Sequence, residues 1–361
     1  MSSLIHVVAC TNKNYLPGAF VTLGSLLDAN DGRDKFVLHV LDTGIGEDGC
    51  ARLRNFIGVF PNAELRIHAV DTACFKDFPA HFGGDLSTYA RLLIGSFVDA
   101  PHCICTDVDV LFLKDVAQLW RKGMRRKKKN PNIIRAIRYF GNPANPAGTL
   151  DYDCPFMPAE EARKYPYYHA GFFMCDLDAW REFDAERKAF DLLRQAGAKL
   201  KLHDQTILNY LLRGRIGNVD PSWCWLANCG PLLTCVVYHY YTDRKPWNRK
   251  TFLTANALWH AYYKIRVRPF YRFTRPWKTR LFNIAWEMRT FFFAFFFTEA
   301  YLKFRRKRGV HERIIAATRN MFKTYRRWVT FGPDLLSRYE LERLSREWRK
   351  KNRINSSATI R

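Results

Sequence analysis

Two aspartates interrupt an otherwise apolar part of the sequence. Residues 103–113 read Cys-Ile-Cys-Thr-Asp-Val-Asp-Val-Leu-Phe-Leu, and Asp107 and Asp109 are their only charged positions. The run is typical of a buried strand, where ionised carboxylates need a compensating cation. Mg²⁺ or Mn²⁺ commonly bridges such carboxylates to substrate phosphates. The pattern therefore indicates a metal site, unless both aspartates only cap the strand and the loop that follows it.

The last third of the chain holds almost all of its excess positive charge. Residues 1–240 contain 28 Lys/Arg and 26 Asp/Glu, whereas residues 241–361 contain 30 and 8. With 48% apolar residues, a globular protein with a large core is expected. The start resembles a first strand rather than a secretory signal, and the ten cysteines form no disulfide framework. We expect a reduced, cytoplasmic setting.

Strand-like and helix-like patterns alternate along the first two thirds of the chain. Such alternation implies a mostly parallel sheet with right-handed crossovers. Ligands bind outside the carboxyl ends of such strands, so residues 11–14 and 107–109 could face one crevice. The expected strands are 5–9, 36–41, 65–70, 103–113, 170–177 and 236–238, and the expected helices are 19–27, 48–59, 88–98 (with Ser87 as N-cap) and 206–212.

Five short segments between residues 4 and 250 form a longer pattern. They are Thr11-Asn12-Lys13-Asn14-Tyr15, Ser87-Thr88-Tyr89-Ala90-Arg91-Leu92, Asp107-Val108-Asp109, His169-Ala170-Gly171 with Asp204-Gln205, and His239 with Lys245-Pro246-Trp247. In this order and spacing they resemble the retaining sugar-nucleotide glycosyltransferases of family 8, which include glycogenin and bacterial lipopolysaccharide galactosyl- and glucosyltransferases. The resemblance implies an α/β fold of glycosyltransferase-A type for residues 1–250, with a Rossmann-like, mostly parallel sheet flanked by helices. Residues 251–361 contain no recognised motif and are expected to form a helical, basic and aromatic extension.

The same resemblance implies a role for each matched residue. Two carboxylates and an imidazole suit Mn²⁺ (or Mg²⁺), which would neutralise the diphosphate leaving group of a UDP-sugar. Gln205 is a poor nucleophile, which favours attack by the acceptor on the front face of the sugar. The implied metal ligands are Asp107, Asp109 and His239; the implied donor-binding residues are Thr11, Asn12, Tyr15, Arg91, Asp107, Val108, Asp109, His169 and Lys245; and the implied catalytic residues are Asp204 and Gln205.

Three positions depart from the family pattern. His169 stands where the family has asparagine, Thr242 where it has glycine, and Asn12 where it usually has aspartate. The first two departures put the donor sugar in question rather than the fold. Simpler interpretations also exist: His239 and His169 could be structural histidines, residues 204–205 a helix N-cap, and Arg91 a surface residue.

Aromatic and basic residues alternate in the C-terminal extension. A membrane span needs about 20 apolar residues, but charged residues interrupt the segment 281–304. Phenylalanines with flanking basic residues suit the interface of an anionic membrane. Alternatively, the phenylalanines pack onto the catalytic domain. Nucleic acid is not expected as a partner, because no known nucleic-acid motif is present.

The sequence therefore predicts a retaining, Mn²⁺-dependent hexosyltransferase. It would move glucose or galactose from a UDP-sugar to a glycan acceptor, lipid-linked as in the lipopolysaccharide core, on the inner face of the cytoplasmic membrane. The alternatives are a non-catalytic nucleotide-sugar-binding or membrane scaffold protein of the same fold, or a protein O-glycosyltransferase.

Overall fold

The computed structural model divides the chain into two compact units. Unit 1 comprises Met1–Leu226 and Thr234–Asp243, and unit 2 comprises Ala227–Leu233 and Arg244–Arg361. The domain boundary predicted at residue 250 lies outside the described residues and stays a prediction. The structure describes residues 3–30, 32, 34–80, 85–123, 132–139, 145, 147–200, 202–220, 223–226, 235–241, 245–247, 256–273 and 277–335.

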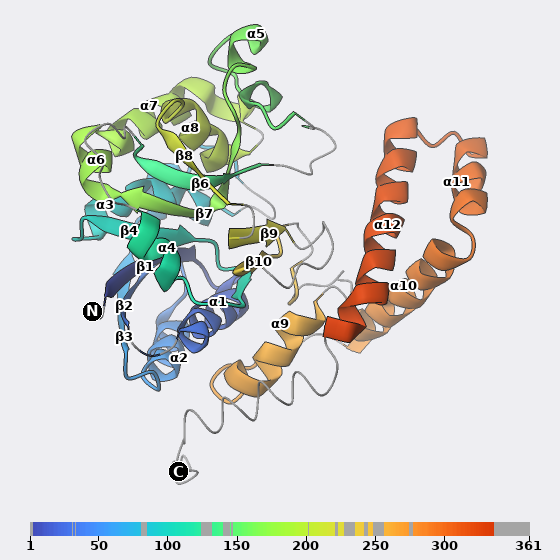
Figure 1. Cartoon of the computed structure of the whole chain (residues 1–361), viewed down its shortest axis with the longest axis horizontal. Coiled ribbons are helices and arrows are strands. Elements are labelled where there is room, and N and C mark those ends of the chain that lie inside the picture. Colours follow the sequence, from blue (N-terminus) through green and yellow to red (C-terminus); the bar gives the residue numbers. More distant parts are fainter. Residues whose placement is uncertain are drawn as a thin grey trace. The chain divides into compact units, whose positions relative to one another are not determined.

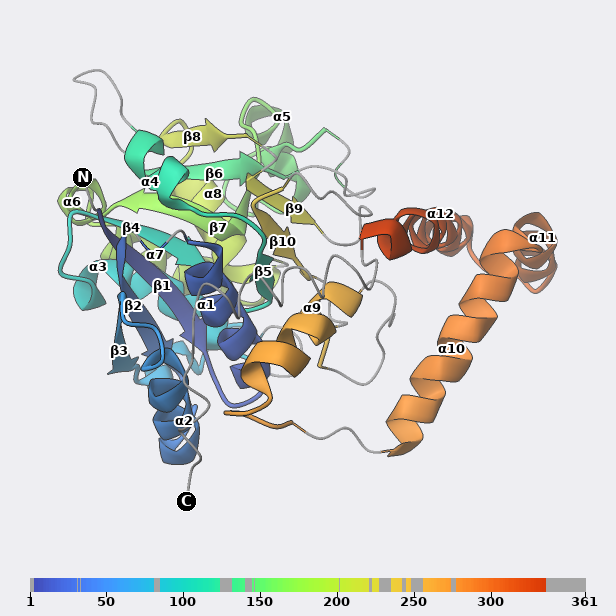
Figure 2. The same cartoon turned by 60° about the horizontal axis from the view of Figure 1, so that its bottom comes forward.

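Unit 1 is built on a mostly parallel sheet, as expected (Figure 1). The strand order β3-β2-β1-β4-β7-β6-β8 can be followed in Figure 2. Only β7 runs antiparallel to its neighbours among the described strands of this sheet. Its strands are β1 (Leu4–Thr11), β2 (Lys35–Asp42), β3 (Ala63–Ala69), β4 (His102–Thr106), β6 (Ile134–Arg138), β7 (Tyr168–Asp176) and β8 (Ile216–Val219).

Helices cover both faces of this sheet. On one face β1, β4 and β7 form a core with α6, α7, α8 and η3, centred on the fully buried Trp180. α1, buried along nearly its whole length, and α2 pack on the other face. The helices of unit 1 are α1 (Leu16–Ala29), α2 (Glu47–Ile57), η1 (Thr72–Phe75), η3 (Ser87–Leu93), α3 (Ile94–Phe97), α4 (Ala117–Gly123), η4 (Leu150–Tyr152), α5 (Ala159–Ala162), α6 (Leu177–Glu182), α7 (Ala185–Ala196), η5 (Gly197–Lys199) and α8 (His203–Leu211).

Two expected elements are interrupted in the structure. The strand predicted over 103–113 ends at Thr106, because Asp107 and Asp109 turn the chain out of the sheet before it resumes as β5 (Val110–Phe112). The helix predicted over 88–98 is the 3₁₀ helix η3 followed by the short α3. Ser87 does not cap it: the N-cap is Leu86, and the Ser87 side chain bonds Asp85 instead.

A second, smaller sheet begins just after the carboxyl end of β4. It consists of β5, β10 (Val237–His239) and β9 (Cys224–Leu226), with β10 in the middle. β10 runs antiparallel to β5, and His239 pairs with Val110. This register brings His239 beside Asp109, although 130 residues separate the two in sequence.

The described part of unit 2 is helical, as expected. Its helices are α9 (Ala257–Tyr262), the π-helical turn Tyr263–Val267, α10 (Trp277–Phe295), α11 (Thr298–Lys307) and α12 (Glu312–Leu335). α10 packs along α12 through Ala294, Phe322 and Tyr325. No helix in the described part of the chain is both long and apolar enough to cross a membrane.

Three histidines form a chain of hydrogen-bonded rings across β1, β2 and β3. His6 Nδ1 lies 3.1 Å from His39 Nε2, and His39 Nδ1 lies 3.0 Å from His68 Nε2. Burial lowers the pKa of all three imidazoles; for His39, which also faces His6, His68 and Arg66, the pKa falls to about 3 despite the opposing charge of Glu64. Each ring is therefore neutral at pH 7.

This chain of rings makes stability depend on pH. Unfolded histidine has a pKa near 6.5, so below that pH the unfolded state binds more protons than the folded state. The contribution of His39 is complete above pH 6.5 and declines as the pH falls toward about 3. We expect His39→Leu to flatten the dependence of the melting temperature on pH between 6.5 and 4.5, measured against wild type. An unchanged slope in the variant would contradict this account.

Candidate functional site

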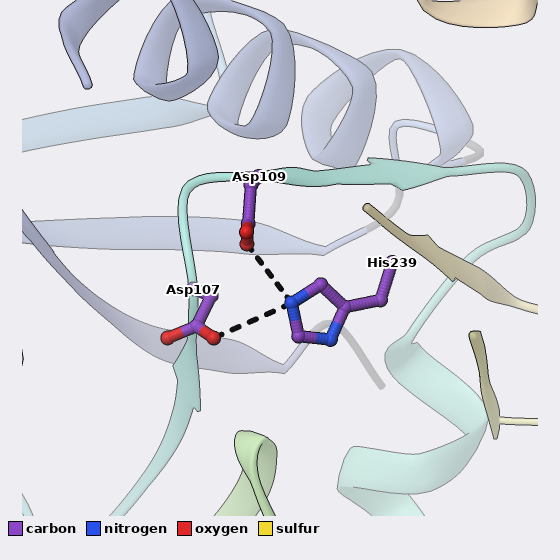
Figure 3. Close-up of side chains that lie close together, drawn as sticks. All are labelled: Asp107, Asp109 and His239. Carbon is purple, nitrogen blue, oxygen red and sulfur yellow. Dashed lines mark ion pairs between the residues drawn. The ribbon is translucent and has the colours of Figure 1, made fainter. Parts of the chain in front are cut away.

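Three potential metal ligands meet at the carboxyl end of β4. Asp107 and Asp109 lie in the turn between β4 and β5, and His239 ends β10 (Figure 3). His239 Nε2 lies 3.0 Å from Asp109 Oδ1 and 3.4 Å from Asp107 Oδ2. One ligand atom from each residue lies within 4.8 Å of the others. The structure thus places these three predicted ligands together.

The chemistry and orientation of these groups fit a divalent cation. Both ring nitrogens of His239 are buried and lack hydrogen-bond geometry to any described residue, even though Nε2 is so close to two carboxylates. Nitrogen and oxygen atoms that converge in this way can also bind a common cation. Two hard oxygens and one imidazole suit Mn²⁺ or Mg²⁺.

The two aspartates favour the protonated form of His239. Burial alone would lower the pKa of His239, but Asp109 and Asp107 raise it well above its ordinary value. Burial alone would raise the pKa of Asp107, but Arg91 and His239 hold it well below its usual range. Since a ligating imidazole must be neutral, a metal ion bound here would release a proton, and its binding would weaken as the pH falls.

Arg91 links the metal-ligand cluster to the start of α8. Its side chain is 8% exposed and forms ion pairs with Asp107 and, at 2.9 Å, with Asp204. The guanidinium also donates to the carbonyl oxygens of Ala170 and Thr88. Arg91 is therefore a buried structural cation in this state, and the surface interpretation is wrong. Contact of Arg91 with a donor stays a prediction.

Asp204 and Gln205 belong to the first turn of α8, which starts earlier than predicted. Asp204 is buried and accepts a hydrogen bond from the Thr88 hydroxyl. The Gln205 amide oxygen accepts from the backbone N–H of Ala170 at 3.0 Å. Both side chains therefore point from α8 toward β7 and η3, beside the metal-ligand cluster.

β7 approaches the cluster through a glycine. A Cβ at Gly171 would lie 2.4 Å from His239, 2.6 Å from Asp107 and 2.6 Å from His169, so only glycine fits. The His169 ring stacks on the Tyr139 ring. It lies edge-on to the His239 ring, and the centroids of the His169 and His239 rings are 4.8 Å apart. Its Nδ1 accepts the N–H of Gly171 at 2.8 Å, which leaves the proton of the neutral ring on Nε2.

The other residues predicted to bind the donor belong to several different elements. Thr11 is buried at the end of β1, Val108 is buried in the turn between β4 and β5, and Tyr15 is the N-cap of α1. Lys245 is buried and belongs to unit 2, and Thr242 lies outside the described residues. The donor-binding roles of these residues stay predictions.

Sequence reasoning missed Asp85, which accepts a hydrogen bond from Asn12 just beyond the end of β1. Asp85 precedes both the matched segment that starts at Ser87 and Leu86, the N-cap of η3. It is not part of that helix, so no helical spacing marks it in the sequence.

Comparisons with known proteins agree on one family. The family model described as "Glycosyl transferase family 8" matches residues 6–251. General stress protein A of Bacillus subtilis (strain 168) is 24% identical over 273 residues, covering 69% of this chain and 89% of that protein. A putative glycosyltransferase of Haemophilus influenzae is 21% identical over 261 residues, covering 69% and 74%.

A solved structure gives the fold type. The galactosyltransferase LgtC, crystallised with donor and acceptor sugar analogues, superposes with a TM-score of 0.59 at 23% identity. The match covers 76% of this chain and 99% of LgtC. Unit 1 therefore has the glycosyltransferase-A fold.

The close approach at Gly171 yields a test of the cluster. We expect Gly171→Ala to displace His239 or Asp107, to lower stability by about 1–3 kcal/mol and to abolish Mn²⁺ binding measured by electron paramagnetic resonance. Gly58→Ala is a matched control, because its Cβ would lie 3.2 Å from the Arg54 carbonyl oxygen and 3.7 Å from that of Asn55, with no contact below 3.0 Å. Unchanged Mn²⁺ binding by folded Gly171→Ala would show that the ion does not lie here.

Proposed function

Since the chain belongs to glycosyl transferase family 8, we propose that it transfers a hexose from a UDP-sugar to a glycan, with retention of configuration. The observation that supports this most directly is the convergence of Asp107, Asp109 and His239 at the carboxyl end of β4. A divalent cation bound there would neutralise the charge that develops on the diphosphate leaving group. We expect Mn²⁺ in this role, because one of the ligands is an imidazole.

The residues around the cluster then have distinct roles. Arg91 holds Asp107 and Asp204 in fixed positions, so the site is organised before the donor arrives. Gln205 lies beside the expected position of the anomeric carbon, and its oxygen is already engaged by Ala170. An engaged amide oxygen is a weak nucleophile, which favours front-face attack by the acceptor. The coupling constant of the anomeric proton in the product would decide between retention and inversion.

A non-catalytic nucleotide-sugar-binding protein of the same fold is the alternative from another class. His169 in place of the asparagine typical of the family favours it. Slow hydrolysis of the donor in the presence of Mn²⁺ would separate the two, since a binding protein leaves the donor intact. Transfer to a protein hydroxyl differs only in the acceptor.

The metal site is tested by one conservative change. Asp109→Asn keeps the shape of the side chain but removes a charged ligand, so we expect Mn²⁺-dependent binding of UDP to fall at least 100-fold while the fold remains. Isothermal titration calorimetry with and without Mn²⁺ measures the effect. Asp48→Asn, at an exposed position on α2, is the control and should bind like wild type. Metal-dependent binding retained by Asp109→Asn would refute the assignment.

An exposed apolar stripe on α10 of unit 2 supports a proposal about where the protein binds its acceptor. Large apolar side chains follow one side of α10 with alternating spacings of four and three residues, so they lie along one stripe. All are exposed, from 37% for Phe295 to 68% for Met288. The stripe consists of Trp277, Leu281, Ile284, Met288, Phe291 and Phe295.

The charge of these helices indicates what covers the apolar stripe. Residues 277–335 contain 13 Lys/Arg and 4 Asp/Glu. A second copy of the same surface would be repelled, whereas an anionic lipid surface attracts it by about 1 kcal/mol per basic residue. We therefore propose that α10 lies in the interface of an anionic membrane, which suits a lipid-linked acceptor such as a lipopolysaccharide core on the cytoplasmic side.

Vesicle binding separates the apolar and electrostatic contributions. The full chain should bind vesicles with anionic lipid, detach partly at high salt and bind neutral vesicles weakly. Ile284→Gln with Met288→Gln should remove the salt-resistant part of the binding. Ala317→Gln with Asn320→Gln, at exposed positions on α12, is the uncharged control. Equal binding by both double variants in cosedimentation would show that the stripe does not enter the membrane.

A further inference from the structure

The side chain of Asn12 has no hydrogen-bonding capacity left for a ligand. Its amide nitrogen donates to Asp85 Oδ1 at 2.8 Å and to Ser87 Oγ at 2.7 Å. Its amide oxygen accepts from the backbone N–H of Asn14 at 2.9 Å and of Tyr15 at 3.3 Å. Two donors and two acceptor sites are all that an amide side chain offers. In this structure, Asn12 therefore holds neighbouring groups in place.

The group that Asn12 holds is the carboxylate of Asp85. Asp85 Oδ1 accepts from Asn12, from the Ser87 backbone N–H at 2.9 Å and from the Ser87 hydroxyl. Its other oxygen, Oδ2, has no hydrogen-bond partner among the described residues, and the side chain is half-buried. One oxygen is thus fixed by three donors, and the second is left as an oriented, charged acceptor.

Asp85 is linked through the chain to residues around the metal-ligand cluster. It is three residues before Thr88, which bonds Asp204, and six before Arg91, which pairs with Asp107. Asn12 follows β1, whose Ala9 pairs with Thr106 immediately before Asp107. The Tyr15 hydroxyl is also close to both groups: burial raises its pKa, and Asp85, Asp109 and Asp107 raise it further. Asp85 therefore lies near the metal-ligand cluster, bonded to the residue that follows β1.

This position matches the needs of a nucleoside diphosphate bound through its phosphates at the cluster. The base is separated from the phosphates by a ribose, so base-binding groups belong beside the metal and not at it. Uracil presents an imide N3–H between two carbonyl groups, and this donor needs an acceptor. We propose that Asp85 Oδ2 accepts the uracil N3–H and that Asn12 is the residue that positions Asp85. The inference rests on the proposed use of a UDP-sugar and names the residue that selects its base.

A carboxylate at this position discriminates between pyrimidines. Cytosine has an unprotonated N3, so its lone pair would face the charged oxygen of Asp85 without a shared proton. The conservative change Asp85→Asn reverses part of this preference. Its amide oxygen can still accept from Asn12 and Ser87, while its amide nitrogen replaces Oδ2 and donates where Asp85 accepts.

The experiment compares nucleotides on the full chain in the presence of Mn²⁺. Wild type should bind UDP more tightly than CDP, and more tightly than UDP methylated at N3. Asp85→Asn should bind UDP about 10- to 100-fold more weakly, the effect of one hydrogen bond to a charged group. The Asp85→Asn variant should no longer prefer UDP over CDP, and methylation of UDP at N3 should weaken binding to the variant little further. Binding of Mn²⁺ with pyrophosphate should stay unchanged, because that ligand has no base.

The outcomes separate this inference from the proposed function. If wild type prefers UDP and Asp85→Asn keeps the full preference, Asp85 does not bind the base, although the proposed function stands. If Asp85→Asn also loses Mn²⁺–pyrophosphate binding, the residue supports the metal site and the inference is wrong. If wild type binds no UDP in the presence of Mn²⁺, the proposed function fails together with the inference. Asp48→Asn again provides the matched control.

Discussion

Three largely buried carboxylates lie close together in unit 1, and neighbouring elements supply the charges that balance them. Asp107, Asp109 and Asp204 cannot remain ionised there without cations, because desolvation of an unpaired charge costs several kcal/mol. Arg91 and a protonated His239 supply positive charge from η3 and β10. The negative charge is neutralised only if η3 and β10 keep Arg91 and His239 beside these carboxylates. The same interactions therefore stabilise the site and the fold. A divalent cation in place of the His239 proton would raise the positive charge by one.

The balance also explains why the chain departs from regular structure at this point. β4 ends at Thr106 because the next residues carry charge that a sheet interior cannot accommodate. β7 passes the cluster at Gly171 because any side chain there would occupy the space of His239 and Asp107. Strand β4 therefore ends, and strand β7 has a residue without a side chain, where the charged groups need space.

The sequence predicted the sheet and the metal-ligand cluster for different reasons. Alternating apolar patterns located β1, β2 and β3 closely, since burial determines strands over many residues. The cluster depended on the family resemblance, because no local pattern connects Asp109 with His239. Asp85 was missed because its role depends on three hydrogen bonds that only the folded loop creates. Arg91 was recognised as a site residue, but its two ion partners lie in β4 and α8, far from it in sequence.

The pairing of β10 with β5 also affects how the protein matures. β10 pairs with β5 so that His239 lies beside Asp109, which is 130 residues earlier in the chain. Contacts between such distant residues form late, because the loop-closure entropy must be overcome before the contact contributes stability. A polypeptide emerging from the ribosome therefore has both aspartates long before it has the histidine. The nascent enzyme would acquire its metal site in one of the last steps of folding, when nearly all of unit 1 has been synthesised.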